Sequence, residues 1–421
     1  MNRRRLLAAL GGTGVLAGCA SRFAPGGGAE TTAAHTVDSP SPPPADAPVG
    51  YTHLRPDGNR RLDGRASLPE SDPVDVELGA AVEWVVGVPH DGGVLLGVVT
   101  PEETRAVSVD SDGVTRIDSD LGTAAGPPLL VGGDDPGFAP ALGSTTTHPV
   151  PTPEGWASVT AGGVVRLPGG ENVDVGAIPD ARLVAAAGRL YLLADRTTAY
   201  AHGVLGDEIE AGAVAVVDPS GGVEATLAPP GGVIEGIAPI VADVDDDGER
   251  ELLVTASDAE RGARLVALSE SDAPALTGPA VGTGFRWRHQ LAVAPFGPDR
   301  ETEVAAVKTP HIGGTAEFYR ATGRGLELVA SRRGYSTHAI GSRTLDTAVA
   351  ADLDGDGRVE LLLPDDPQRA LAGLRRVDGG VEEAWRVSLG GRLTSNVCAV
   401  DGSEGVVVAA GTERGLRVWP A

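Results

Sequence analysis

The chain has 421 residues and is strongly acidic, with 58 Asp and Glu against 34 Lys and Arg and a formal net charge of -24. This charge excludes a protein that binds nucleic acid through its phosphates, because that mode of binding needs a basic surface. Hydrophobic residues make up 41% of the chain, which allows a sizeable buried core.

The N-terminus has the features of an export signal. Three consecutive arginines precede an apolar run from Leu6 to Leu16. The run is shorter than the roughly 20 residues that a membrane-spanning helix needs, so we interpret residues 1–18 as a twin-arginine-like signal peptide. The small residues before Cys19 resemble a lipobox, at which cleavage leaves this cysteine as a lipidated N-terminus. An uncleaved anchor or a cytosolic N-terminal helix is the alternative.

A flexible tether is predicted after the signal. Residues 19–50 comprise the lipidated cysteine and a stretch rich in Gly, Pro, Ser, Thr and Ala, which cannot bury enough apolar surface to fold. We therefore expect a protein held by its lipid at the extracellular face of the cell membrane. Residues 51–421 would form the folded domain, which we expect to be monomeric.

Two residue types are unusually rare. Lys308 is the sole lysine, and this acid-rich, lysine-poor composition is similar to that of proteins from halophilic archaea. Arginine bias from GC-rich coding is the alternative explanation. Besides Cys19, the chain has only Cys398, whose apolar neighbours predict a small buried residue without a disulfide.

Short apolar runs separated by Gly and Asp turns fill the chain from about Val74 onward, without a long amphipathic helix. A hairpin turn recurs at intervals of about 50 to 59 residues, measured at the aliphatic residue that opens the strand after it. Those residues are Val114, Val164, Val223, Leu276, Leu326 and Val381. Four short strands in such a period are typical of a propeller blade.

The repeat predicts an all-β fold, a β-propeller of seven four-stranded blades. In the fourth blade, residues 237–244 form the innermost strand, 251–256 the second and 264–268 the third. The last repeat lacks an outer strand, and we expect residues 74–78 to supply it and close the ring. Six or eight blades, a β-helix and a sandwich are the alternatives.

Two segments share the pattern D-x-D-x-D-G-x-x-E-L after an apolar strand. Their carboxylates belong to Asp243, Asp245, Asp247 and Glu251, and to Asp352, Asp354, Asp356 and Glu360. Acids at alternate positions converge when the backbone wraps a hard cation, and calcium takes six to eight oxygens in such a flexible cage. The sequence therefore predicts two Ca²⁺ sites. An acidic turn without metal is the alternative, whereas an EF-hand is excluded because no helices flank the loops.

A third copy of this loop has lost half of its acids. Pro295 and Gly297 stand where the first two aspartates stand in the other loops, while Asp299 and Glu303 remain. We expect this loop to keep the geometry of the blade without binding calcium.

The loop motif within blades of this length resembles the FG-GAP/VCBS repeat family, which includes the propellers of integrin-type α-subunits and many microbial surface proteins. The match covers two blades well and one weakly. The resemblance implies calcium, a seven-bladed ring, and ligation by the eight acids named above together with the backbone carbonyls of Glu249 and Arg358. It does not identify a partner.

A second group of residues falls in loops on the opposite face of the predicted ring, namely His289, Lys308, His311, His338 and Arg343. They are candidates for a face that binds a partner or a small anion. Exposed loop residues without a joint role, and a three-histidine zinc site, are the alternatives.

The favoured function is an adhesion or interaction module that recognises a surface protein or a glycan. A propeller enzyme acting on extracellular polysaccharide and an envelope assembly scaffold are the alternatives, because a fold does not choose among them. We favour a protein without catalysis, since neither a G-x-S-x-G nor an H-E-x-x-H motif is present.

Overall fold

The computed structural model describes residues 41–421 except 125, 143–145, 201, 203–207, 272, 285, 340–341 and 343. The predictions for the signal peptide, Cys19 and Arg343 lie outside these residues. Residues from Ser39 to Ala421 form one compact unit. Nearly all of its regular structure is β-strand, as the sequence predicted, and none of the described residues forms a helix long and apolar enough to cross a membrane.

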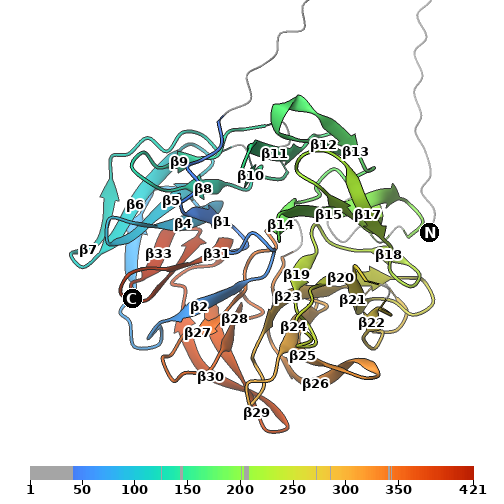
Figure 1. Ribbon diagram of the computed structural model, residues 1–421. Coiled ribbons are helices and arrows are strands. Elements are labelled where there is room, and N and C mark those ends of the chain that lie inside the picture. The colour runs from blue at the N-terminus through green and yellow to red at the C-terminus, as the bar shows by residue number, and fades with distance from the viewer. Residues whose placement is uncertain are drawn as a thin grey trace, which may run out of the picture. The chain divides into compact units, whose positions relative to one another are not determined.

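Seven four-stranded blades follow one another along the described chain, and Figure 1 shows them arranged around a ring. Within each blade, neighbouring strands pair antiparallel. Blade 1 consists of β4 (Trp84–His90), β5 (Gly93–Val99), β6 (Thr104–Asp110) and β7 (Gly113–Ile117). Blade 2 consists of β10 (Val150–Thr152), β11 (Gly155–Val159), β12 (Val164–Arg166) and β13 (Asn172–Asp174), with a 3-10 turn η1 (Pro168–Gly170). Blade 3 consists of β14 (Val184–Ala186), β15 (Arg189–Thr197), β16 (Glu210–Val217) and β17 (Val223–Leu227).

Blades 4 to 7 carry the sites discussed below. Blade 4 consists of β19 (Ile240–Ala242), β20 (Glu251–Ser257), β21 (Arg264–Ser269) and β22 (Leu276–Thr277), and blade 5 of β23 (Arg288–Ala294), β24 (Glu303–Lys308), β25 (Thr315–Thr322) and β26 (Gly325–Arg333). Blade 6 consists of β27 (Val349–Asp352), β28 (Glu360–Pro364), β29 (Ala370–Val377) and β30 (Gly380–Ser388). Blade 7 consists of β31 (Leu393–Asp401), β32 (Val406–Thr412) and β33 (Gly415–Trp419) together with β3 (Val74–Glu77). The short strand β18 (Val233–Ile234) bridges blades 3 and 4.

The N-terminal strand closes the ring as predicted. β3 pairs antiparallel with β33, with Val76 opposite Leu416, and so becomes the outer strand of the last blade. Blade 7 in turn packs against blade 1 through an apolar layer that includes Val407 of blade 7 and Val85 and Val107 of blade 1. The chain thus meets itself across the ring, and blade 7 gains the strand that the last repeat lacks.

One small sheet was not predicted. β1 (Val49–Tyr51), β8 (Leu129–Val131) and β9 (Gly137–Phe138) form a three-stranded sheet that lies between blades 1 and 2. Leu130 on one side of it joins the core shared with blade 1, and Tyr51 on the other joins the core shared with blade 2. The described part of the ring therefore has seven blades of four strands and, in addition, this three-stranded sheet.

The segment around β1 and β2 (Arg61–Arg65) runs through the middle of the unit, where Figure 1 shows both strands in blue. β2 pairs in parallel with β27, the innermost strand of blade 6. Between the two strands, Asn59 exchanges hydrogen bonds with the backbone of Val293 in blade 5, at 2.9 and 3.0 Å. The N-terminal segment is therefore an integral part of the ring.

Candidate metal centre

The two acidic loops occupy the same place in blades 4 and 6. The first acidic loop, residues 243–251, joins β19 to β20, and the second acidic loop, residues 352–360, joins β27 to β28. Each loop connects the innermost strand of its blade to the second strand. Both follow strands that are buried on both faces, so their backbones leave the ring at fixed positions.

In the first acidic loop, one oxygen each from Asp243, Asp245 and Glu251 lie within 4.8 Å of one another. Backbone N–H groups orient two of these carboxylates. The N–H of Gly248 donates to Asp243 Oδ2 at 3.0 Å, and the N–H of Val244 donates to Glu251 Oε2 at 2.9 Å. The other oxygen of each carboxylate is left for a ligand.

The second acidic loop repeats these bonds residue for residue. Gly357 N–H donates to Asp352 Oδ2 at 3.0 Å, and Leu353 N–H donates to Glu360 Oε2 at 2.9 Å. Here the oxygens within 4.8 Å of one another belong to Asp352, Asp354 and Asp356. The loops therefore share one backbone-directed arrangement and differ in which three acids stand closest.

The remaining residues of the predicted ligand sets lie in the same turns. Asp247 Oδ1 accepts the N–H of Glu249 at 2.8 Å, and Asp356 Oδ1 accepts the N–H of Arg358 at 2.9 Å. The fourth loop position is left-handed in both loops, with φ of 61° at Asp246 and 77° at Gly355. These turns bring the later acids back toward the first one.

Three carboxylate oxygens in the two loops are buried without a hydrogen bond, namely Asp243 Oδ1, Asp352 Oδ1 and Glu360 Oε1. Burial, with repulsion from Asp245 and its neighbours, raises the pKa of Glu251 to about 7. Burial likewise raises the pKa of Glu360 to about 8, with Asp354 adding to the effect. Unpaired buried carboxylate oxygens are costly, and a cation would satisfy them. The residues present therefore fit a calcium ion, which would draw its ligands from these acids.

The second acidic loop differs from the first by one basic side chain. Arg375, on β29, pairs with Asp354 Oδ2 at 3.0 Å and also with Asp356, and its Nε lies 3.8 Å from Glu360 Oε1. No ion pair involves the acids of the first loop among the described residues. The guanidinium competes with a cation for the same carboxylates, so the two loops are expected to bind calcium unequally.

The third loop, residues 295–303, shows what replaces the ion when the acids are lost. Its closing acid, Glu303, is fully buried and pairs with Arg376 at 2.8 Å and Arg320 at 2.6 Å. A side chain at Gly297 would collide with Glu301, which fills the space of the missing carboxylates. Two arginines thus neutralise the acid whose counterparts in the other loops are the predicted calcium ligands.

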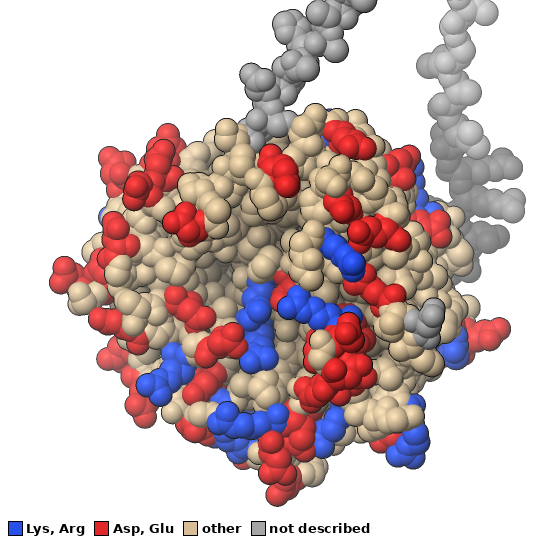
Figure 2. Space-filling view, viewed as in Figure 1, with Lys and Arg blue, Asp and Glu red and all other residues tan. Residues whose placement is uncertain are grey.

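The third loop also contacts both acidic loops. Arg300 of the third loop donates to the carbonyl of Gly357 at 2.7 Å, and Thr302 donates to Asp246 at 2.6 Å. The third loop therefore lies between the two acidic loops and contacts both. Figure 2 shows acidic side chains spread over the viewed face of the ring, with basic side chains gathered near its middle.

On the predicted ligand face, three of the histidines lie in one row. The ring centroids of His311 and His338 are 5.6 Å apart, and His338 meets the edge of Trp287 at 6.0 Å. Trp287 in turn stacks on His289 at 4.8 Å. Burial lowers the pKa of each of the three histidines, so the row is uncharged at neutral pH.

Lys308 does not join this row. Its Nζ pairs with Glu317 at 2.7 Å, on the same carboxylate that Arg288 holds at 3.0 Å, so its charge is used within blade 5. Lys308 is the last residue of β24, directly before the loop in which the sequence analysis expected it, and no local pattern indicated that its side chain would pair with Glu317 on the neighbouring strand β25.

Two adjoining hollows lie over the row. One, of 340 Å³, is lined by His311, His338 and Asp366, and the other, of 420 Å³, by Thr344, Glu413 and again His338. Both are lined by Gln368 and Arg392. Their lining is mostly polar, which suits a ligand recognised through hydrogen bonds rather than an apolar one.

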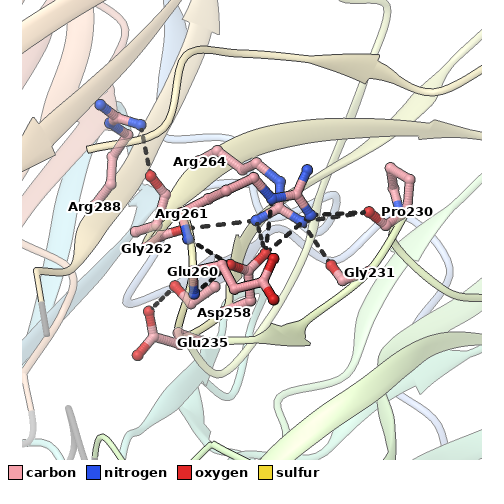
Figure 3. A network of polar contacts seen from close by, with 11 residues as sticks. Pro230, Gly231, Glu235, Asp258, Glu260, Arg261, Gly262, Arg264 and Arg288 are labelled. Carbon is pink, nitrogen blue, oxygen red and sulfur yellow. Dashed lines mark hydrogen bonds and ion pairs between the residues drawn. The ribbon is translucent and has the colours of Figure 1, made fainter. Parts of the chain in front are cut away.

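The sequence did not reveal the buried acid of this face. Glu235 is fully buried, accepts a hydrogen bond from Ser257 and pairs with His202. Beside it, Figure 3 shows Asp258 held by Arg261 and Arg264, with Arg264 also donating to the carbonyl of Gly231 at 2.6 Å. In the sequence, Glu235 follows an apolar run, and nothing there indicates that its carboxylate is buried.

Comparisons with known proteins bear on the fold only. No family model and no curated protein matches the chain. Among solved structures, the quinohemoprotein alcohol dehydrogenase ADHIIG of Pseudomonas putida HK5 is 10% identical, with a TM-score of 0.49, over 87% of this chain and 79% of that one. Streptogramin B lyase is 9% identical, with a TM-score of 0.38, over 84% and 98% of the two chains. Apo AztD from Citrobacter koseri is 12% identical, with a TM-score of 0.37, over 79% and 89%.

Likenesses at these scores carry no argument about function. The class of protein is defined by its own strand order, which is that of a β-propeller with blades of four antiparallel strands.

Calcium should stabilise the protein through both acidic loops. Asp243→Asn and Asp352→Asn each weaken one cage, so each should remove one of two binding events in a calorimetric titration. At calcium 100-fold above Kd, each lost site lowers the free energy of unfolding by about 2.7 kcal/mol. Asp299→Asn, in the third loop, is the matched control and should change neither measurement. If calcium added to the wild-type protein gives no heat, and if chelators leave its Tm unchanged, the loops are acidic turns only.

Arg375→Gln should strengthen calcium binding at the second acidic loop by about tenfold, or about 1.4 kcal/mol, because the competing charge is gone. The titration is made in the Asp243→Asn background, which isolates the second loop. Arg324→Gln is the control, since Arg324 is exposed and pairs only with Glu327. Weaker binding in Arg375→Gln would mean that the arginine supports the site instead of competing for it.

Proposed function

We propose that this chain is a lipid-anchored, calcium-binding β-propeller of the FG-GAP/VCBS kind, working at the outer cell surface as an adhesion or interaction module. The observation that carries the proposal is the pair of acidic loops. Each has the same two backbone hydrogen bonds to its first and last acid and the same unpaired Oδ1 on its first aspartate. Such repetition at equivalent blade positions supports a shared ligand better than chance acidity does.

Calcium has a structural role in this proposal. Its ligands would come from a loop between two buried strands, so the ion would fix where each loop leaves the blade. Because the third loop contacts both acidic loops, ordering two of them restricts the third. The result would be a rigid face built from three neighbouring blades.

The partner would bind through hydrogen bonds. The hollows beside His311 and His338 are polar and open, and they suit a protein loop or a glycan, both of which present hydroxyl and amide groups. The proposed tether begins at Cys19 and ends before β1, because Val49 and Gly50 pair with β8, and it would allow the domain to reach such a partner beyond the membrane surface.

The Cys19→Ser variant tests the proposed lipid anchor, and the same purified variant serves as the probe for binding to the cell surface. The wild-type protein should partition with membranes, whereas the variant should be recovered without lipid. The purified variant, added to cells that lack the protein, should bind their surface with calcium and detach with chelator.

Two further variants are made in the Cys19→Ser background. The double change Asp243→Asn with Asp352→Asn should abolish the calcium-dependent binding, and Asp299→Asn should leave it intact. Identical membrane partitioning of wild type and Cys19→Ser would refute the anchor, and surface binding that ignores both calcium and the double change would refute the calcium-dependent module.

A further inference from the structure

A buried cluster of charges lies where the N-terminal segment crosses the ring. Asp346, with 1% of its side chain exposed, pairs with Arg182 at 2.8 Å and with Arg60 at 2.8 Å. A second bond joins Arg182 Nη1 to the same carboxylate at 3.0 Å. Arg60 comes from the N-terminal segment, Arg182 precedes blade 3 and Asp346 precedes blade 6, so the cluster ties three parts of the ring together.

The cluster holds one positive charge more than it can balance. The two guanidinium groups are 7% and 4% exposed and share the single carboxylate, and neither pairs with another acid of the described chain. The nearby His53, His148 and His289 do not help, because burial lowers the pKa of each and keeps it neutral. An unbalanced charge in the interior of a protein is strongly unfavourable unless a counter-charge lies beside it.

A small cavity lies against this cluster. It has a volume of 20 Å³ and is lined by Arg60, Arg182, His53, Trp287 and His289, among others. That volume is enough for one water-sized species.

The lining offers unpaired donors. Trp287 Nε1 and Arg60 Nε are buried without a hydrogen-bond partner, and both can only donate. Both ring nitrogens of His53 are also buried and unpaired, and in the neutral ring one of them carries a proton. Three residues that line the cavity thus carry buried N–H donors without a partner among the described residues, beside a positive charge that no second carboxylate balances.

We propose that this cavity binds one small monovalent anion of the size of chloride. An anion accepts from all three donors at once and balances the surplus charge of Arg60 and Arg182. A water molecule in the same place would leave the positive charge unbalanced.

The anion would lock the N-terminal segment into the ring. His53 and Arg60 belong to that segment, while Trp287 directly precedes blade 5 and Arg182 directly precedes blade 3. This role is independent of calcium and of any surface partner, and it predicts that stability depends on the kind of anion as well as on ionic strength.

Diffraction from crystals of the protein grown in sodium bromide tests the site, because bromide replaces chloride and scatters anomalously. An anomalous peak is expected within contact distance of Trp287 Nε1 and Arg60 Nε. A cavity that holds only water, or nothing, in bromide would overturn the proposal.

Thermal unfolding gives the solution readout. With calcium saturating and ionic strength constant, replacing gluconate by chloride should raise Tm by about 1 to 3 °C for each tenfold increase in chloride above Kd. Trp287→Phe removes one donor and should weaken this dependence. Trp385→Phe is the matched control, since Trp385 also has a buried unpaired Nε1 but does not line the cavity.

Arg60→Gln removes the surplus charge and should abolish the chloride dependence even if it lowers Tm overall. Equal chloride dependence in wild type, Trp287→Phe and Arg60→Gln would show that chloride acts elsewhere, and would overturn the assignment to this cavity.

Discussion

The ring depends on the way in which residues 49–77 are built into three different sheets. β1 pairs with β8, β2 with β27, and β3 with β33, so one short stretch completes the small sheet, extends blade 6 and closes blade 7. The segment between β1 and β2 is fixed by Arg60 and by the exchange of bonds between Asn59 and Val293. Partners for this stretch come from distant parts of the chain, so the ring cannot be complete until the last blade has formed.

The same stretch reaches the acidic loops. Ala66 N–H donates to the carbonyl of Asp352 at 2.8 Å, and Leu68 N–H donates to that of Leu353 at 2.8 Å. On the other side, Val241 N–H, in the strand before the first loop, donates to the carbonyl of Asp57 at 2.9 Å. A cation in either loop would therefore order the segment that follows the proposed tether. The segment between the proposed tether and the closing strand β3 would therefore link the proposed anchor, the acidic loops and the closed ring.

The sequence predicted the blades because each one repeats the same turn chemistry, and it predicted the closing strand because the last repeat was one strand short. It could not predict the small sheet, since β1 is separated from β8 by a whole blade and neither carries the repeated turn. The two arginines of β29 show a second limit. Adjacent strand residues point to opposite faces, so Arg375 meets the second acidic loop while Arg376 reaches Glu303 of the third. Arg375 contacts a loop of its own blade and Arg376 contacts an acid of blade 5, and no local pattern in the sequence indicates either partner.

Hydrogen exchange of the full chain, followed with and without calcium, tests the link between the loops and the ring most directly. If the account is correct, calcium slows exchange at the N–H groups that hold the acids, those of Val244, Gly248, Leu353 and Gly357, and also at Ala66 and Leu68 in the N-terminal segment. The N–H groups of Gly297 and Arg300 lie in the third loop, which contacts both acidic loops without holding an ion, and their exchange should be slowed less than that of the acidic loops. Exchange at the acidic loops and at residues 66–68 that is the same with calcium as with chelator would contradict the account.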